Sequence, residues 1–185
     1  MAYNMKDVFY LDTSIDTGTG TGDGIATLDF SSYVDPIARG RSKGTGLAIY
    51  KVHFDICDDD GNTPVAAATT GQFRAALLSL SGAPAAAVGS ASFNNNVLNA
   101  SNDLMIAGVD YVAGGTAAGD PAPHVFLEPS TEVPYVVVRD QIILGINVPS
   151  GLGMSVGSSV KVRIECAQVT LDQSTLNQLL RTQTV

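Results

Sequence analysis

The stretch Ser159–Leu171, SVKVRIECAQVTL, decides the fold class because apolar and charged side chains alternate along it. Every second position is apolar: Val160, Val162, Ile164 and Cys166. The positions between them carry charges: Lys161, Arg163 and Glu165. Successive side chains of a β-strand point to opposite faces of the sheet. The pattern therefore predicts a strand with one buried face and one face that is wet or paired.

A second segment, Leu47–Cys57, LAIYKVHFDIC, has the same period of two. We expect one face of this strand to carry Ala48, Tyr50, Val52, Phe54 and Ile56. We expect the other face to carry Lys51, His53 and Asp55. The strand should end at the acidic turn DDDGN, residues 58–62, because Asp, Asn and Gly favour turns.

Seven shorter segments also read as strands, bounded by Gly, Pro, Asn or Asp. They are Val8–Leu11, Ala26–Val34, Phe73–Leu80, Leu104–Val112, His124–Leu127, Tyr135–Val138 and Ile142–Ile146. We interpret the last two as a hairpin, because Arg139, Asp140 and Gln141 form a short connection between two β-prone runs. The chain thus has eight or nine expected strands.

Only the C-terminal end shows a helical period. Leu176, Leu179 and Leu180 are spaced for one face of a helix, with Asp172 or Ser174 as its N-cap. We expect a short helix that lies on the strands.

Two stretches, Asp16–Gly24 and Gly82–Asn102, are rich in glycine or small residues and read as long loops. Long loops of this kind are commonly functional or disordered. Without defined elements of their own, they are candidates for contacts with neighbouring molecules.

The bulk composition fits one folded domain over residues 1–185, with 45% hydrophobic and 15% charged residues. No run approaches the roughly 18 apolar residues of a membrane span. The net charge of −8 disfavours direct contact with nucleic acid. The one basic cluster, Arg39, Arg41 and Lys43, is short and broken by glycine, so we interpret it as a solvated loop.

Several motifs invite a chemical interpretation that their context opposes. Gly153–Gly157 matches the G-x-S-x-G pattern of hydrolases, but both histidines precede the serine and a strand follows it. The run Asp58–Asp60 lacks the spacing of a calcium loop, and we favour a plain turn while leaving a bound cation open. His53 has no zinc-ligand spacing around it and is expected at the surface or in an interface.

Three further residues leave questions that the sequence does not answer. Cys57 and Cys166 do not form a disulfide framework, although a mutual disulfide remains open. Asn99 begins an Asn-Ala-Ser glycosylation pattern, which has a high chance rate. We predict no catalytic, cofactor-binding or metal-binding residue, and therefore no enzyme.

Short strands with glycine-rich turns favour an all-β fold of two packed sheets. The chain has no Trp, and the Cys and Trp pattern of immunoglobulin domains is missing, so we favour a single jelly roll of about eight strands with a short C-terminal helix.

The stretches EVPYVVVRDQIILGINV (132–148) and VKVRIECAQVTLDQSTLNQLL (160–180), with the size and acidity, resemble single jelly-roll major capsid proteins. The group that they resemble belongs to tailless icosahedral archaeal viruses with an internal membrane. The resemblance implies a capsid protein of the virion that assembles with copies of itself and with a second, related capsid protein. An underlying viral membrane would then separate the shell from the genome.

Two other functions remain open beside this one. A capsid decoration or spike protein would share the β-rich character and the tendency to self-associate. A lectin-like or adhesin-like β-sandwich would use its loops to bind a ligand, although the lack of Trp weakens carbohydrate stacking.

Overall fold

The computed structural model describes residues 8–17, 22–35, 43–58, 60–61, 71–79, 98–113, 122–149 and 157–183. Within these ranges lie nine strands and one helix. They are β1 (Phe9–Asp16), β2 (Gly22–Asp29), β3 (Lys43–Asp58), β4 (Gly71–Leu78), β5 (Met105–Ala113), β6 (Ala122–Leu127), β7 (Tyr135–Val137), β8 (Gln141–Val148), β9 (Ser158–Asp172) and α1 (Gln173–Thr182).

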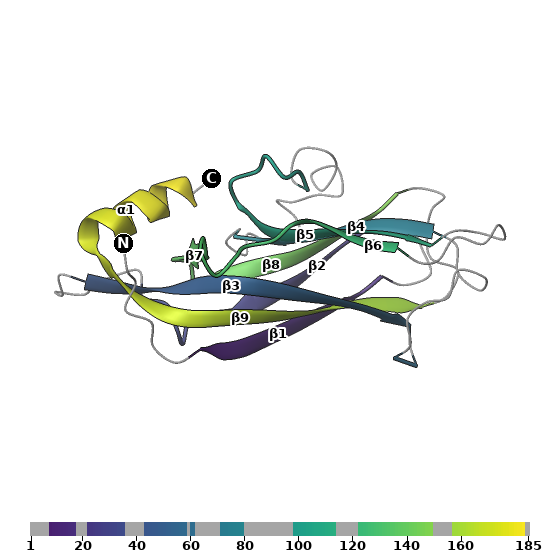
Figure 1. The fold of residues 1–185 in the computed structure, drawn as a ribbon, viewed down its shortest axis with the longest axis horizontal. Coiled ribbons are helices and arrows are strands. Elements are labelled where there is room, and N and C mark those ends of the chain that lie inside the picture. Colours follow the sequence, from purple (N-terminus) through teal and green to yellow (C-terminus); the bar gives the residue numbers. More distant parts are fainter. Residues whose placement is uncertain are drawn as a thin grey trace.

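The strands form two antiparallel sheets that pack face to face (Figure 1). One sheet has the order β1-β9-β3-β7, and the other has the order β2-β8-β4-β5-β6. Apart from the edge strand β6, the pairing is nested: β1 pairs with β9, β2 with β8, β3 with β7, and β4 with β5. Such nesting is obtained by rolling up one long antiparallel ribbon, and it defines a jelly roll. The predicted fold class is confirmed.

A bulge in β3 corrects the predicted faces of the Leu47–Cys57 strand. The pairing with β9 shifts between Ile49 and Lys51, so Tyr50 is the extra residue. A bulge moves every later side chain to the opposite face. Leu47 and Ile49 therefore share the inner face with Val52, Phe54 and Ile56. Ala48 and Tyr50, which we had placed on that face, lie on the outer face.

The space between the sheets is filled by a single cluster that we call the sandwich core. Its members include Phe30, Leu47, Ile49, Val52, Leu77, Tyr111, Leu144, Val162 and Ile164. The inner face of β9 is the predicted one, since Val160, Val162, Ile164 and Cys166 all belong to this cluster. The interior therefore consists of packed apolar side chains.

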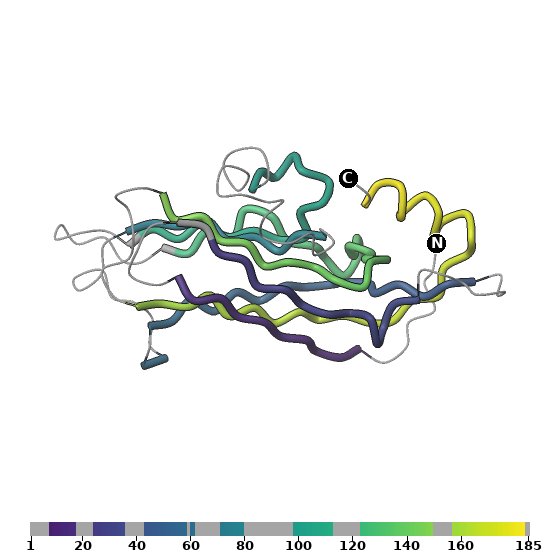
Figure 2. The backbone as a smooth tube through the Cα atoms, turned by 180° about the vertical axis from the view of Figure 1, so that it is seen from behind, coloured from purple at the N-terminus to yellow at the C-terminus, as the bar shows by residue number. Residues whose placement is uncertain are grey.

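Helix α1 covers one end of the outer face of the four-stranded sheet (Figures 1 and 2). Asp172 is its N-cap, because its Oδ1 accepts a hydrogen bond from the Thr175 amide at 2.7 Å. This bond also lowers the pKa of the Asp172 carboxyl group. The buried Leu176 packs on Ala48, Tyr50, Val138, Ala167, Val169 and Leu171, a group we call the helix cluster. The predicted C-terminal helix and its cap are confirmed.

The predicted hairpin of residues 135–146 is wrong. β7 pairs with β3, whereas β8 lies between β2 and β4 in the other sheet. The chain crosses from sheet to sheet at residues 138–140, and the Asp140 carbonyl accepts a bond from the Phe30 amide at 2.6 Å. The outer edge of β7 is bonded instead by the Gln183 side chain, which donates to the Val136 carbonyl and accepts from the Val138 amide. Both strands are β-prone, and their local sequence does not specify which partner each one takes.

The region predicted as the strand Ala26–Val34 also differs. β2 begins earlier, at Gly22, and ends at Asp29, whose Oδ1 accepts a bond from the Ser31 amide. Gly24 belongs to β2, where it pairs with Ile146 of β8. A Cβ at this position would lie 2.9 Å from Ile15 Cδ1, so only glycine fits without movement. The predicted loop Asp16–Gly24 is therefore shorter. Its residues 18–21, and residues 82–97 of the second predicted loop, lie outside the described residues.

One glycine of β5 is expected to be required by packing. The ring of Phe126 on β6 lies directly against Gly108, where a Cβ would overlap it. We predict that Gly108→Ala lowers the free energy of unfolding by about 1–3 kcal/mol, the usual cost of overpacking. Urea denaturation measures the change, and the double variant Gly108→Ala/Phe126→Leu should recover part of it. Unchanged stability of Gly108→Ala would contradict this close packing.

Candidate functional site

The outer face of the four-stranded sheet is charged where α1 does not cover it. We call this surface the polar face; its residues are Tyr10, Asp12 and Ser14 of β1, Lys161, Arg163 and Glu165 of β9, and Lys51, His53 and Asp55 of β3. Most of them line an open depression of about 770 Å³. Six of these residues are the predicted polar positions of β3 and β9. The contribution of β1, which pairs with β9, was not predicted.

Strand register arranges the polar face in three rows. The first is Tyr10–Glu165–Lys51, the second Asp12–Arg163–His53, and the third Ser14–Lys161–Asp55. Neighbouring strands are about 4.8 Å apart, so side chains within a row are close neighbours. Each row therefore brings one acidic, one basic and one further polar side chain close together.

Two contacts on the polar face join one row to the next. His53 Nε2 lies 2.7 Å from Glu165 Oε1, and the Arg163 guanidinium lies 5.7 Å from the centre of the Tyr10 ring. The pKa of Lys161 is raised, chiefly by a hydrogen bond to Cys57 and also by the nearby Asp55 carboxylate. His53, predicted at the surface or in an interface, is an exposed member of this face.

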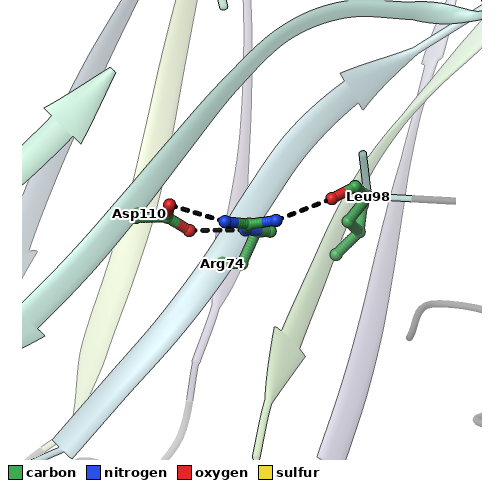
Figure 3. Close-up of polar contacts among 3 residues, drawn as sticks. All are labelled: Arg74, Leu98 and Asp110. Atoms are coloured by element: carbon green, nitrogen blue, oxygen red, sulfur yellow. Dashed lines mark hydrogen bonds and ion pairs between the residues drawn. The ribbon is translucent and has the colours of Figure 1, made fainter. Parts of the chain in front are cut away.

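A second cluster of polar contacts, formed by Arg74, Asp110 and the Leu98 carbonyl, lies on the five-stranded sheet (Figure 3). Arg74 of β4 donates from Nε and a terminal nitrogen to the two oxygens of Asp110 on β5, at 2.5 and 2.7 Å. Its other terminal nitrogen donates to the Leu98 carbonyl at 2.9 Å. The bond to Asp110 raises the pKa of Arg74. Arg74 thereby fastens the segment before β5 to the sheet, and sequence reasoning did not identify it.

Arg74 also lies over the ring of Phe126, with its Cζ 4.6 Å from the ring centre. The carbonyl that it binds belongs to Leu98, whose side chain is buried against Ala76, Leu78, Met105 and Ile143. These contacts stabilise the fold, because they connect β4 with β5, β6 and the segment before β5.

The other residues singled out in the sequence lie apart from the polar face or from one another. Asp58 and Gly61 form the expected turn, with a bond from the Gly61 amide to the Asp58 carbonyl at 3.0 Å. Asn99 is exposed in a turn, where its side chain accepts a bond from the Ser101 amide. Residues 153–156 of the G-x-S-x-G pattern lie outside the described residues. Among the residues described, no three His, Cys, Asp or Glu side chains form a group that could hold a metal ion.

The two cysteines do not form a disulfide. Cys57 lies opposite Ser159 and Cys166 lies opposite Ile49, which places the two far apart along the same ladder. Seven residues separate Ser159 from Cys166 along β9, which corresponds to roughly 23 Å. Both thiols are free and buried, and burial raises the pKa of Cys166 to about 12.

The raised pKa gives a prediction for thiol chemistry. In a Cys57→Ala variant at pH 8, we expect a thiol reagent to modify Cys166 only after the protein is denatured, since the thiolate is the reactive form. With a disulfide reagent that releases a coloured thiolate on reaction, the increase in absorbance measures how much Cys166 has been modified. Rapid modification of the native protein would contradict the buried position of Cys166.

The Arg74 contacts predict a stability change. Arg74→Met should lower the free energy of unfolding by about 1 kcal/mol, because the ion pair of Arg74 with Asp110 is bidentate but partly exposed to solvent. Arg74→Lys should recover only part of this loss, since one ammonium group cannot replace three directed N–H donors. Chemical denaturation measures both variants. Glu132→Gln, which removes an exposed charge that forms no ion pair with the described residues, is the control, and an equal loss there would refute the role of Arg74.

Comparison with known proteins gives similarity in structure only. No family model matches the chain, and no curated protein matches it. None of the helices in the described part of the chain is long and apolar enough to span a membrane.

The solved structures that the chain is similar to include structures of viral proteins and of a virus. The chain is similar to the VP1 pentamer of human polyomavirus 7, with 10% identity, a TM-score of 0.41, and coverage of 89% of this chain and 96% of that one. For human polyomavirus 12 VP1 in complex with 3′-sialyllactosamine the identity is 6%, the TM-score 0.43, and the coverage 90% and 100%. For the structure of turnip yellow mosaic virus the identity is 11%, the TM-score is 0.32, and the match covers 90% of this chain and 94% of that one.

Proposed function

We propose that the chain is a structural protein of a virion, a capsid subunit that assembles with copies of itself. The observation that supports this most directly is the nested jelly-roll order combined with an apolar interior. Jelly rolls serve in capsids, lectins and cupins. In this chain the charged side chains of the four-stranded sheet lie on its outer surface, where they can meet other molecules.

Charge supports a more specific version of the proposal. A shell protein with a net charge of −8 needs some other material between itself and the genome. A lipid layer would provide it. We therefore propose the arrangement of the tailless icosahedral archaeal viruses with an internal membrane, in which the protein forms capsomers with a second, related capsid protein.

Electron microscopy of the purified protein tests the function. We expect capsomers or closed shells, formed by the protein alone or after addition of the second capsid protein, because jelly-roll subunits associate through their faces and edges. In purified virions, quantitative mass spectrometry should give the copy number of a main shell protein. A low copy number would favour a decoration or spike protein. A protein that stays monomeric at high concentration and forms no particles would contradict the proposal.

The lectin-like alternative has one observation in its favour, the open depression on the polar face with Tyr10, His53 and Arg163 on its walls. A glycan array with the purified protein distinguishes it from the capsid function. Specific binding together with an absence of particles would favour the lectin-like function.

A further inference from the structure

Four charges of the polar face, in the first and third rows of β9 and β3, form the corners of a square and alternate in sign around it. Glu165 and Lys51 lie opposite each other in the first row, and Lys161 and Asp55 lie opposite each other in the third. In order around the square, the side chains are Glu165 (negative), Lys51 (positive), Asp55 (negative) and Lys161 (positive). A surface with this pattern is complementary to a second copy of itself that is turned by half a revolution.

Lys51, Lys161 and Asp55 form no ion pair within 4.0 Å in the described part of the chain. In the described ranges, two ion pairs have a nitrogen and an oxygen within 4.0 Å: His53 with Glu165, and Arg74 with Asp110. Glu165 is therefore bound by His53 and not by Lys51, its neighbour across the ladder. Lys51 is left with a charge that a second molecule can pair.

Helix α1 determines which of two half-turn arrangements is possible. It covers the outer face just beyond the first row, because Ala48 and Ala167 are the next outward-facing pair and belong to the helix cluster. A two-fold axis along the strands would place both helices at the same end. Facing sheets are about 10 Å apart and one helix is also about 10 Å wide, so two helices do not fit in that layer.

An axis across the strands avoids this overlap. It turns the second molecule end to end, so that the two helices lie at opposite ends of the contact. Only one helix then lies between the two facing sheets at each end. In this arrangement Lys51 meets Asp55 of the second copy, and Lys161 meets Glu165 of the second copy. The central row places Arg163, Asp12 and His53 each against its own counterpart, and the charges of Asp12 and Arg163, which are in register, compensate each other there.

We propose that the polar face docks face to face onto the polar face of a second copy of this chain, about a two-fold axis that crosses the strands at Arg163 and His53. The contact forms four intermolecular ion pairs: two between Lys51 and Asp55, and two between Lys161 and Glu165. This rests on the proposed assembly function and deepens it by naming one surface through which two subunits meet.

Charge reversal on β3 tests the contact, with sedimentation equilibrium at low salt as the measurement. Lys51→Glu alone and Asp55→Lys alone place like charges together, and each should weaken self-association by roughly tenfold or more. The double variant Lys51→Glu/Asp55→Lys should associate again, and so should an equal mixture of the two single variants. Association of the wild type should weaken as salt increases.

The double variant separates docking from folding effects. Inside the chain it places a carboxylate at position 51 opposite Glu165 and an ammonium group at position 55 opposite Lys161, so its internal pairs are worse than those of either single variant. Recovered association therefore cannot come from a repaired fold, and thermal unfolding of every variant checks that each one is folded. Glu132→Lys reverses an exposed charge outside the polar face and serves as the control.

The outcomes also separate this inference from the proposed function. If the single variants still associate and form particles like the wild type, the polar face is not the contact and the capsid function stands. If the wild type forms dimers that depend on these charges but never forms particles, the contact stands and the capsid function falls. A wild type that remains monomeric in both experiments overturns both.

Discussion

The structure depends on one antiparallel ladder, the pairing of β3 with β9. It extends from Lys43 opposite Asp172 to Asp58 opposite Ser158, so the two longest strands are bonded over almost their whole length. β1 and β7 add to its two sides, and the five-stranded sheet packs across its inner face. Because β9 leads directly into α1, the same ladder also fixes where the helix lies. The charged rows are a consequence of the register of this ladder.

β3 contributes side chains to the sandwich core on one face and to the helix cluster on the other, with one extra residue at Tyr50. Before Tyr50, residues 47 and 49 face the sandwich core, and after it residues 52, 54 and 56 do so. Near the helix, the intervening Ala48 and Tyr50 are buried as well. β9 achieves the same without a bulge, since its outer positions change from charged to apolar after Glu165. The outer face is thereby divided into an apolar half under the helix and a charged half open to solvent.

Much of this was predictable because alternation is a local property. The existence of the strands, the helix and its Asp172 cap, and the charged side of the two long strands could be predicted from short windows of sequence. The bulge at Tyr50 was not predicted, because Ala48, Tyr50, Val52, Phe54 and Ile56 suggest an unbroken alternation, and only the apolar Ile49 departs from it. The partners of β7 and β8 could not be predicted, since both strands are β-prone and their pairing is decided by segments far away in the chain. Arg74 was missed for the same reason, because Asp110 and Leu98 meet it only in the folded sheet.

The central position of β9 has a consequence for biosynthesis. In the finished sheet it lies between β1 and β3, although those two strands are made long before it. Until β9 has been made, the backbone amide and carbonyl groups of β1 and β3 that bond to it in the finished sheet lack these partners. Such edges recruit strands from other molecules. A chain that stops before residue 158 would lack these partners permanently, and it would be a candidate for aggregation or for capture by chaperones.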